Sequence, residues 1–297
     1  MTTRWSVSRL GNLDGYRIIV TGATNGVGLA TARALAGAGA QVILAVRNVE
    51  LGARRAAEMG GDTTVVRLDL ADQASVRAFP TLIDGDVDIL INNAGAVTQH
   101  RTETADGFES TLGTNFLGPF ALTNLLFPRV RSKIINVGSD AHKMASFTFD
   151  DPHLRTGWSA LPAYGRSKLA VMLWGLELDR RLRAAGCAVS TYLTHPGWVA
   201  SNLSNVSGGP VMTAFHNVVH AAANIFANDI DAGAAPTLYC MTEPIPPGSY
   251  VGIDSKRGLK GGPTLSGRSA AACDYQDAAR LWSFAERETG TTLSLVK

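Results

Sequence analysis

The sequence predicts an α/β protein built on one doubly wound parallel sheet with helices on both faces. Two observations predict this fold class. Short apolar runs that suit buried strands alternate with longer segments that suit helices through most of the 297 residues. The short runs are apolar almost throughout, as are strands of a parallel sheet covered on both faces. No repeat, linker or low-complexity stretch interrupts the pattern, so we expect residues 1–297 to form a single domain.

The first half of the chain shows the alternation most regularly. Its first strand runs into a turn with glycines at positions 22, 26 and 28, and an alanine-rich helix follows. Helical connections of this length join parallel strands. The expected strands are Arg17–Thr21, Gln41–Val46, Thr63–Leu68 and Val87–Ile91. The expected helices are Leu29–Ala38, Val49–Met59 and Asp72–Ile83.

The second half continues the pattern with longer helices. A helix is expected over Thr104–Pro128, with a kink at Gly118-Pro119, because proline lacks the N–H that a helix interior needs. A second long helix contains Tyr164, and a last one covers Tyr275–Thr289. The expected strands are Lys133–Val137, Ala188–Leu193 and, as the final strand of the sheet, Ser249–Ile253.

Composition narrows the class of protein. A hydrophobic content of 45% and a charged content of 18% suit a globular protein with a substantial core. The net charge of +2 gives no reason to expect nucleic acid or an anionic membrane as a partner. The three cysteines show neither metal-ligand nor disulfide spacing, and no apolar run approaches the length of a membrane span. We therefore expect a cytoplasmic protein without a metal site.

The turn after the first strand has the glycine spacing G-x-x-x-G-x-G, at Gly22, Gly26 and Gly28. Glycines allow a tight turn and a close backbone approach, and the following helix offers free N–H groups to a pyrophosphate. A plain glycine-rich connection is the alternative interpretation. The position between a strand and a helix favours dinucleotide binding by Gly22, Thr24, Asn25, Gly26, Val27 and Gly28.

Tyr164 and Lys168 are spaced to lie on one face of their helix. An ammonium beside a phenol stabilises the phenolate, so the pKa of Tyr164 is expected to fall below its ordinary value of roughly 10. Such a tyrosine could act as a general acid or base. The spacing also occurs by chance on many helices, so the rest of the chain has to decide its meaning.

Taken together, these motifs resemble those of the short-chain dehydrogenase/reductase family. Thr21-Gly22-Ala-Thr-Asn-Gly26-Val-Gly28 matches the family's T-G-x-x-x-G-x-G turn. The further matches arrive in the family's order and cover roughly residues 14–255. They are Asp69-Leu70, Asn92-Asn-Ala-Gly95, Asn115, Ser139, Tyr164, Lys168 and His195-Pro-Gly197. The resemblance implies a Rossmann fold that binds a nicotinamide dinucleotide.

Site roles follow from the resemblance. It implies that Tyr164 exchanges a proton with the substrate oxygen and that Ser139 hydrogen-bonds the carbonyl. It implies that Lys168 lowers the Tyr164 pKa and binds the nicotinamide ribose, and that Asn115 holds a water of a proton relay. A helix-bending asparagine is the alternative for Asn115. The implied cofactor contacts are Asp69, Leu70, Asn93, Ala94, Gly95, Tyr164, Lys168, Pro196, Gly197 and Val199.

The end of the second expected strand bears on the choice of cofactor. A carboxylate there would bind a ribose 2′-hydroxyl and repel a 2′-phosphate. This chain has Val46, Arg47 and Asn48 instead. An arginine forms strong, forked hydrogen bonds with phosphate, so we expect NADP(H) rather than NAD(H), bound in part by Arg47 and Asn48. The alternative is that Arg47 is merely a solvated residue.

The substrate end is less clear from the sequence. The long segment Asp140–Ala163 and the Arg47-Asn48 pair resemble the branch with retinol dehydrogenases, the WW-domain oxidoreductase and protochlorophyllide reductases. A substrate lid is expected over residues 198–229, and a C-terminal extension over 255–297. An apolar stripe within 211–226 faces a lipophilic substrate, the core or a partner. Many relatives form dimers or tetramers, so the resemblance also implies a homo-oligomer.

The sequence thus predicts an NADP(H)-dependent oxidoreductase acting on an alcohol or carbonyl substrate. Its catalytic residues would be Asn115, Ser139, Tyr164 and Lys168. Two alternatives stay open: an NADP(H)-binding sensor or scaffold without turnover, and a reductase of carbon–carbon double bonds.

Overall fold

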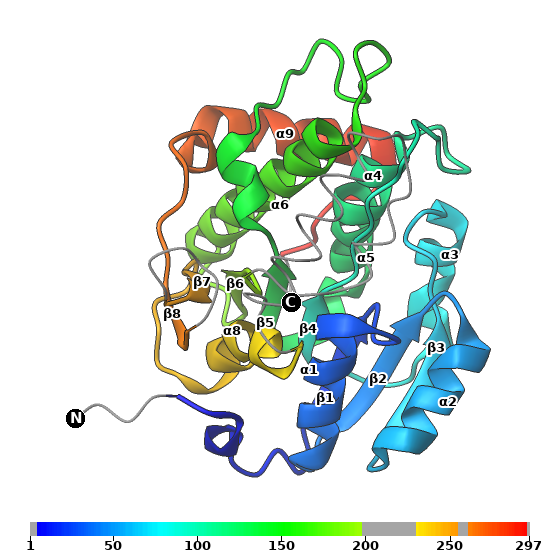
Figure 1. Cartoon of the computed structure of the whole chain (residues 1–297), viewed down its shortest axis with the longest axis vertical. Helices are drawn as coiled ribbons and strands as arrows, with labels where there is room; N and C mark the ends of the chain where they lie inside the picture. Colours follow the sequence, from blue (N-terminus) through cyan, green and yellow to red (C-terminus); the bar gives the residue numbers. More distant parts are fainter. Residues whose placement is uncertain (1–4, 198–229, 255–260, 296–297) are drawn as a thin grey trace, which may run out of the picture.

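The structure contains the sheet that the sequence predicts. The computed structural model describes residues 5–197, 230–254 and 261–295. Within these residues, eight strands form one sheet in the order β3-β2-β1-β4-β5-β6-β7-β8 (Figure 1). All neighbours from β3 to β7 pair in parallel, and β8 pairs antiparallel with β7. The strands are β1 (Arg17–Thr21), β2 (Gln41–Val46), β3 (Thr63–Arg67), β4 (Val87–Asn92), β5 (Val130–Val137), β6 (Ser190–Thr194), β7 (Tyr250–Ile253) and β8 (Pro263–Leu265).

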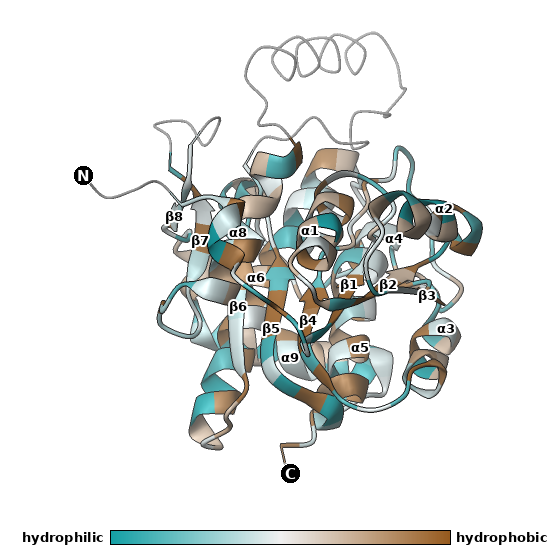
Figure 2. Cartoon of the chain, turned by 90° about the horizontal axis from the view of Figure 1, so that it is seen from below, coloured by the Kyte–Doolittle hydropathy of each residue, from teal (hydrophilic) through white to brown (hydrophobic). Residues whose placement is uncertain are grey.

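Helices cover both faces of this sheet (Figure 2). One apolar core lies under α1, α2 and α8, and the other lies under α3, α5, α6 and α9. In the second core, the Trp282 ring of α9 packs 5.0 Å from the Phe120 ring of α5. The helices are α1 (Gly26–Gly37), α2 (Val49–Met59), α3 (Gln73–Ala78), α4 (Ser110–Leu112), α5 (Gly118–Leu126), α6 (Ala160–Ala184), α8 (Ile230–Thr242) and α9 (Tyr275–Thr289). The doubly wound fold class is therefore confirmed.

The helix expected over Thr104–Pro128 begins later than predicted. Gly107 turns the chain with a φ of 80°, and the Glu109 carboxylate then accepts hydrogen bonds from the first N–H groups of α4. The chain passes through a π-helical turn at Gly113–Leu117 and continues as α5. Pro119 lies in the first turn of α5, where its missing N–H costs little. The irregularity is therefore a π-helical turn before the proline.

Three further features of the fold differ from the sequence-based expectation. The helix expected over Asp72–Ile83 ends as α-helix at Ala78, and a 3₁₀ turn with Pro80 follows. β7 is not the last strand, because β8 adds an antiparallel edge. No expected element covers α8, which packs against α1.

No helix in the described parts of the chain is long and apolar enough to cross a membrane. The predicted lid at 198–229 lies outside the described residues.

Candidate active site

A cleft of about 650 Å³ opens beyond the carboxyl ends of the parallel strands. Many of the residues that line the cleft come directly after β1, β2, β4, β5 or β6 in the chain. Doubly wound sheets bind their ligands beyond these strand ends. Every residue predicted above to bind the cofactor lines this cleft, except Val199, which lies outside the described residues. Ser139 lines it too. Residues up to 175 positions apart in the sequence therefore meet at one site.

The glycine turn leaves no room for side chains. A Cβ on Gly28 would lie 2.5 Å from the Gly22 carbonyl oxygen and 2.3 Å from Asn93 Nδ2. Gly22 has a φ of 69°, which favours glycine, and a Cβ there would lie 2.9 Å from Ala94 Cα. The Asn25 side chain makes no capping bond at the start of α1. The first N–H groups of α1 thus suit a pyrophosphate in the cleft.

The segment after β4 is fastened to the end of β1. Thr21 Oγ1 accepts hydrogen bonds from the N–H groups of Asn93 and Ala94, both at 3.0 Å. Asn93 Nδ2 donates to the Thr21 carbonyl oxygen at 2.9 Å. These bonds fix the part of the cleft wall that lies beside the glycine turn.

Arg47 is exposed at the end of β2 and lines the cleft. The Asn48 side chain caps α2, because its Oδ1 accepts a 2.8 Å hydrogen bond from Leu51 N–H. Among the described residues that line this end of β2, none carries a carboxylate. A cation beside a helix N-terminus makes this corner suitable for an anion.

Ser139 lies in a turn directly after β5. Its Oγ accepts a 3.2 Å hydrogen bond from Ala141 N–H and contacts the Tyr164 hydroxyl through a second hydrogen bond. The turn approaches α6 closely at Gly165, where a Cβ would come 3.2 Å from the Ala141 carbonyl oxygen. The small residue beside Tyr164 thus allows the two hydroxyl groups to meet.

The expected lowering of the Tyr164 pKa is contradicted by the structure. Burial raises the pKa of the half-buried Tyr164, and the hydrogen bond from Ser139 only partly opposes it. The Lys168 ammonium lies 5.7 Å from the centre of the tyrosine ring and donates to the Val137 carbonyl oxygen at 2.9 Å. Desolvation of the phenolate is therefore the dominant effect on the Tyr164 pKa. Tyr164 is a protonated phenol near neutral pH.

Lys168 is almost fully buried, and burial lowers its pKa to about 8. A lysine in an unfolded chain has a pKa of about 10.4. At pH values between these two pKa values, the folded protein therefore binds fewer protons at Lys168 than the unfolded chain does. Burial of Lys168 consequently destabilises the folded state less as the pH rises. The free energy of unfolding of the wild type, relative to Lys168→Met, should rise by about 2 kcal/mol from pH 7 to 9.5. Urea unfolding of both proteins at each pH measures this, and a pH-independent difference would contradict it.

Asn115 lies in the π-helical turn just behind the cleft. Its side chain pairs with the Ala96 backbone, accepting from N–H at 2.7 Å and donating to the carbonyl oxygen at 2.9 Å. A third bond of 2.9 Å reaches Ser167 Oγ on α6. A Cβ on Gly95 would lie 3.5 Å from Asn115 Oδ1 and 3.4 Å from Lys168 Nζ, so the two atoms flank the same glycine. The predicted relay role stays a prediction.

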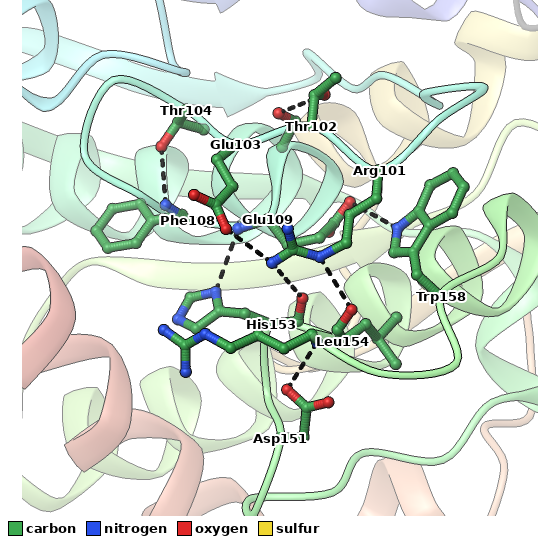
Figure 3. Close-up of polar contacts among 12 residues, drawn as sticks. Arg101, Thr102, Glu103, Thr104, Phe108, Glu109, Asp151, His153, Leu154 and Trp158 are labelled. Carbon is green, nitrogen blue, oxygen red and sulfur yellow. Dashed lines mark hydrogen bonds and ion pairs between the residues drawn. The ribbon is translucent and has the colours of Figure 1, made fainter.

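The long segment between Ser139 and Tyr164 is fastened to the loop before α4 (Figure 3). Trp158 Nε1 donates to the buried Glu109 carboxylate at 3.2 Å. His153 Nδ1 accepts from Glu109 N–H at 3.2 Å. Arg101 Nε donates to the carbonyl oxygen of Leu154, whose φ of 47° is left-handed. These contacts give the segment a defined shape ahead of the Tyr164 helix.

Comparison with known proteins identifies the family. A family model described as short chain dehydrogenase matches residues 17–208. The chain belongs to the short-chain dehydrogenase family. Its Rossmann-like fold and the oxidoreductase class expected from the sequence agree with this membership.

Individual relatives of this short-chain dehydrogenase point to one branch. It is 42% identical to human retinol dehydrogenase 12 over 64% of the chain and 41% identical to mouse polyprenol dehydrogenase over 67%. The chain spans 64% of the length of each of these relatives. A crystal structure of an uncharacterized protein from Mycobacterium paratuberculosis is 38% identical, with a TM-score of 0.85, and covers 98% of this chain and all of that one. The expected likeness to the retinol dehydrogenase branch is confirmed.

Sequence reasoning missed several residues of the dehydrogenase cleft. Val97, Gln99 and Thr114 also line it. Val97 and Gln99 follow the Asn92–Gly95 element closely, so their position in the chain was a usable signal. Thr114 belongs to the π-helical turn, which no pattern in the sequence indicated.

Proposed function

We propose that this dehydrogenase is an NADP(H)-dependent oxidoreductase that transfers hydride between the nicotinamide and an alcohol or carbonyl substrate. One observation carries the proposal: Ser139, Tyr164 and Lys168 converge on the same cleft as the glycine turn. They come from the β5 turn and from α6, while the glycine turn comes from β1 and α1. The same cleft therefore offers a dinucleotide cradle and groups that exchange a proton.

The described residues fit a nicotinamide dinucleotide. The glycine turn gives backbone room beside the uncapped N-terminus of α1, and Asp69 and Leu70 line the cleft beyond β3. Arg47 would hold the 2′-phosphate, and Lys168 would hold the nicotinamide ribose. When bound, the dinucleotide supplies or accepts the hydride.

Tyr164 and Ser139 would handle the proton and the oxygen. In carbonyl reduction, the Tyr164 hydroxyl gives its proton to the substrate oxygen while the carbonyl carbon gains the hydride. Ser139 Oγ, already hydrogen-bonded to Tyr164, would donate to the same oxygen and stabilise the developing negative charge. The raised pKa of Tyr164 keeps the phenol protonated near neutral pH, which is the form that carbonyl reduction requires.

We further propose a lipophilic substrate. Met144 is 90% exposed at the end of the Ser139 turn, and Leu161 is 52% exposed one helical turn before Tyr164. Exposed apolar side chains this close in the chain to Ser139 and Tyr164 suit an apolar substrate chain. The names of the two curated relatives, retinol dehydrogenase and polyprenol dehydrogenase, point to the same class.

Arg47→Gln tests the choice of cofactor. Loss of a charged hydrogen bond to the 2′-phosphate should raise the Kd of NADPH by tenfold or more, because such bonds contribute roughly 1.5–3 kcal/mol. The Kd of NADH, which has no 2′-phosphate, should change less than twofold. Arg54→Gln, at an exposed arginine of α2 outside the cleft, is the matched control. Equal losses for both cofactors would contradict the assignment.

A substrate panel tests the proposed reaction. The panel contains all-trans-retinal, nonanal, acetaldehyde and cyclohexanone with NADPH and with NADH, and the matching alcohols with NADP⁺ and NAD⁺. We expect turnover of the long-chain aldehydes with NADPH. The loss of NADPH absorbance at the nicotinamide band measures this turnover. No turnover across the panel would favour a sensor or scaffold, and turnover with NADH alone would overturn the Arg47 assignment.

A further inference from the structure

His142 is a fully buried histidine between the catalytic turn and the C-terminal part of the chain. Its Nδ1 lies 2.6 Å from the Ser139 carbonyl oxygen. Its Nε2 lies 3.3 Å from Ser269 N. The ring also packs edge-on against Tyr250 of β7, with ring centres 5.6 Å apart. One side chain therefore touches the backbone of Ser139 and a segment more than 120 residues later.

The two backbone partners fix the state of the ring. The Ser139 carbonyl oxygen can only accept, so Nδ1 must carry a proton. The Ser269 N–H can only donate, so Nε2 must be unprotonated. Only the neutral ring with its proton on Nδ1 satisfies both partners. Burial lowers the pKa of His142, which keeps this neutral form populated near pH 7.

The C-terminal segment that meets His142 is anchored independently. β8 pairs with β7, and Ser266 N–H donates to the Tyr250 carbonyl oxygen at 2.8 Å. The Arg268 guanidinium donates to the Gly248 carbonyl oxygen. This segment lies beyond residues 17–208, which the family model matches. It therefore offers the ring a fixed support from outside the matched region.

We propose that His142 is a positioning residue that braces the catalytic Ser139 turn against the C-terminal segment. The proposal rests on the proposed function, because it assigns Ser139 to the reaction. The His142 backbone N–H also donates to the Ser139 carbonyl oxygen, at 3.2 Å, so this peptide is held twice. Fixing the peptide fixes the direction of the Ser139 side chain toward Tyr164. Small displacements of a positioned group lower rates strongly.

Two substitutions separate positioning from packing. His142→Phe keeps a ring beside Tyr250 but removes both polar ends, whereas His142→Gln keeps a donor and an acceptor but removes the ring. With NADPH and nonanal, we expect kcat to fall about tenfold in His142→Phe, with KM and the Kd of NADPH within twofold of the wild type. His142→Gln should retain several times more activity than His142→Phe. The opposite order would show that the ring only fills space and would overturn the proposal.

Hydrogen exchange supplies a readout without turnover. His142→Phe should speed amide exchange in both segment 139–144 and segment 266–274, whereas Ser269→Ala, which keeps the N–H group that meets His142 and loses only the bond from Ala272 N–H to Ser269 Oγ, should leave segment 139–144 unchanged. Faster exchange in neither segment or in only one of them overturns the brace. If the wild type fails to reduce any aldehyde, the proposed function fails, but this exchange pattern still decides whether His142 couples the two segments.

Discussion

Tyr164→Phe is expected to lower kcat for carbonyl reduction by roughly 10²–10⁴-fold, the usual contribution of a general acid. The variant loses only the hydroxyl that meets Ser139 and would give its proton to the substrate oxygen. The Kd of NADPH should change little, because the ring stays in place on α6. Steady-state kinetics with the best aldehyde of the panel, together with fluorescence titration of NADPH, measure both quantities.

Tyr16→Phe provides the matched control for this loss. Tyr16 is exposed and lies before β1, outside the cleft, so removing its hydroxyl should leave kcat unchanged. If Tyr164→Phe kept more than a tenth of the wild-type activity, another group would be the proton donor.

Gly28→Ala is expected to weaken NADPH binding by about thirtyfold. The new Cβ would overlap the Gly22 carbonyl oxygen and Asn93 Nδ2, so the turn must open. Overpacking of this kind costs roughly 1–3 kcal/mol, and about 2 kcal/mol corresponds to the stated change in Kd. Fluorescence titration with NADPH and with NADH should show the same loss, because the strain lies at the turn shared by both cofactors.

Gly37→Ala is the control from the same helix. A Cβ at Gly37 meets nothing within 4 Å, and alanine favours a helix over glycine. We expect unchanged binding and a slightly raised Tm. Wild-type affinity in Gly28→Ala would show that the glycine turn does not approach the cofactor.

Much of the fold could be predicted from the sequence because its signals are local. β1, β2, α2 and α9 begin and end at the predicted residues, since apolar runs, the Asn48 cap and the Gly290 stop mark them clearly. The glycine turn and the Asn92–Gly95 element could be recognised from their residue spacing, and both reach the cleft.

The remaining features depend on contacts between distant parts of the chain. The late start of the helix at α4 is one of them: Gly107 turns the chain, and the Glu109 carboxylate is drawn into a cap at α4 and a bond with Trp158. The pKa of Tyr164 was predicted from its neighbour Lys168 alone, whereas burial decides its direction. The partners of His142 could not be inferred, because Ser269 approaches it only through β7 and β8.

The most direct test of the proposed reaction follows a deuterium atom. NADPH labelled with deuterium at the transferable position of nicotinamide C4 is incubated with the enzyme and the aldehyde that the panel shows to be reduced, and the alcohol is examined by mass spectrometry and NMR. We predict one deuterium atom on the carbon that carries the hydroxyl group. Two results would contradict hydride transfer to a carbonyl at this site. One is deuterium on a carbon of a former double bond, and the other is an unlabelled alcohol when either of the two hydrogens on nicotinamide C4 is replaced by deuterium.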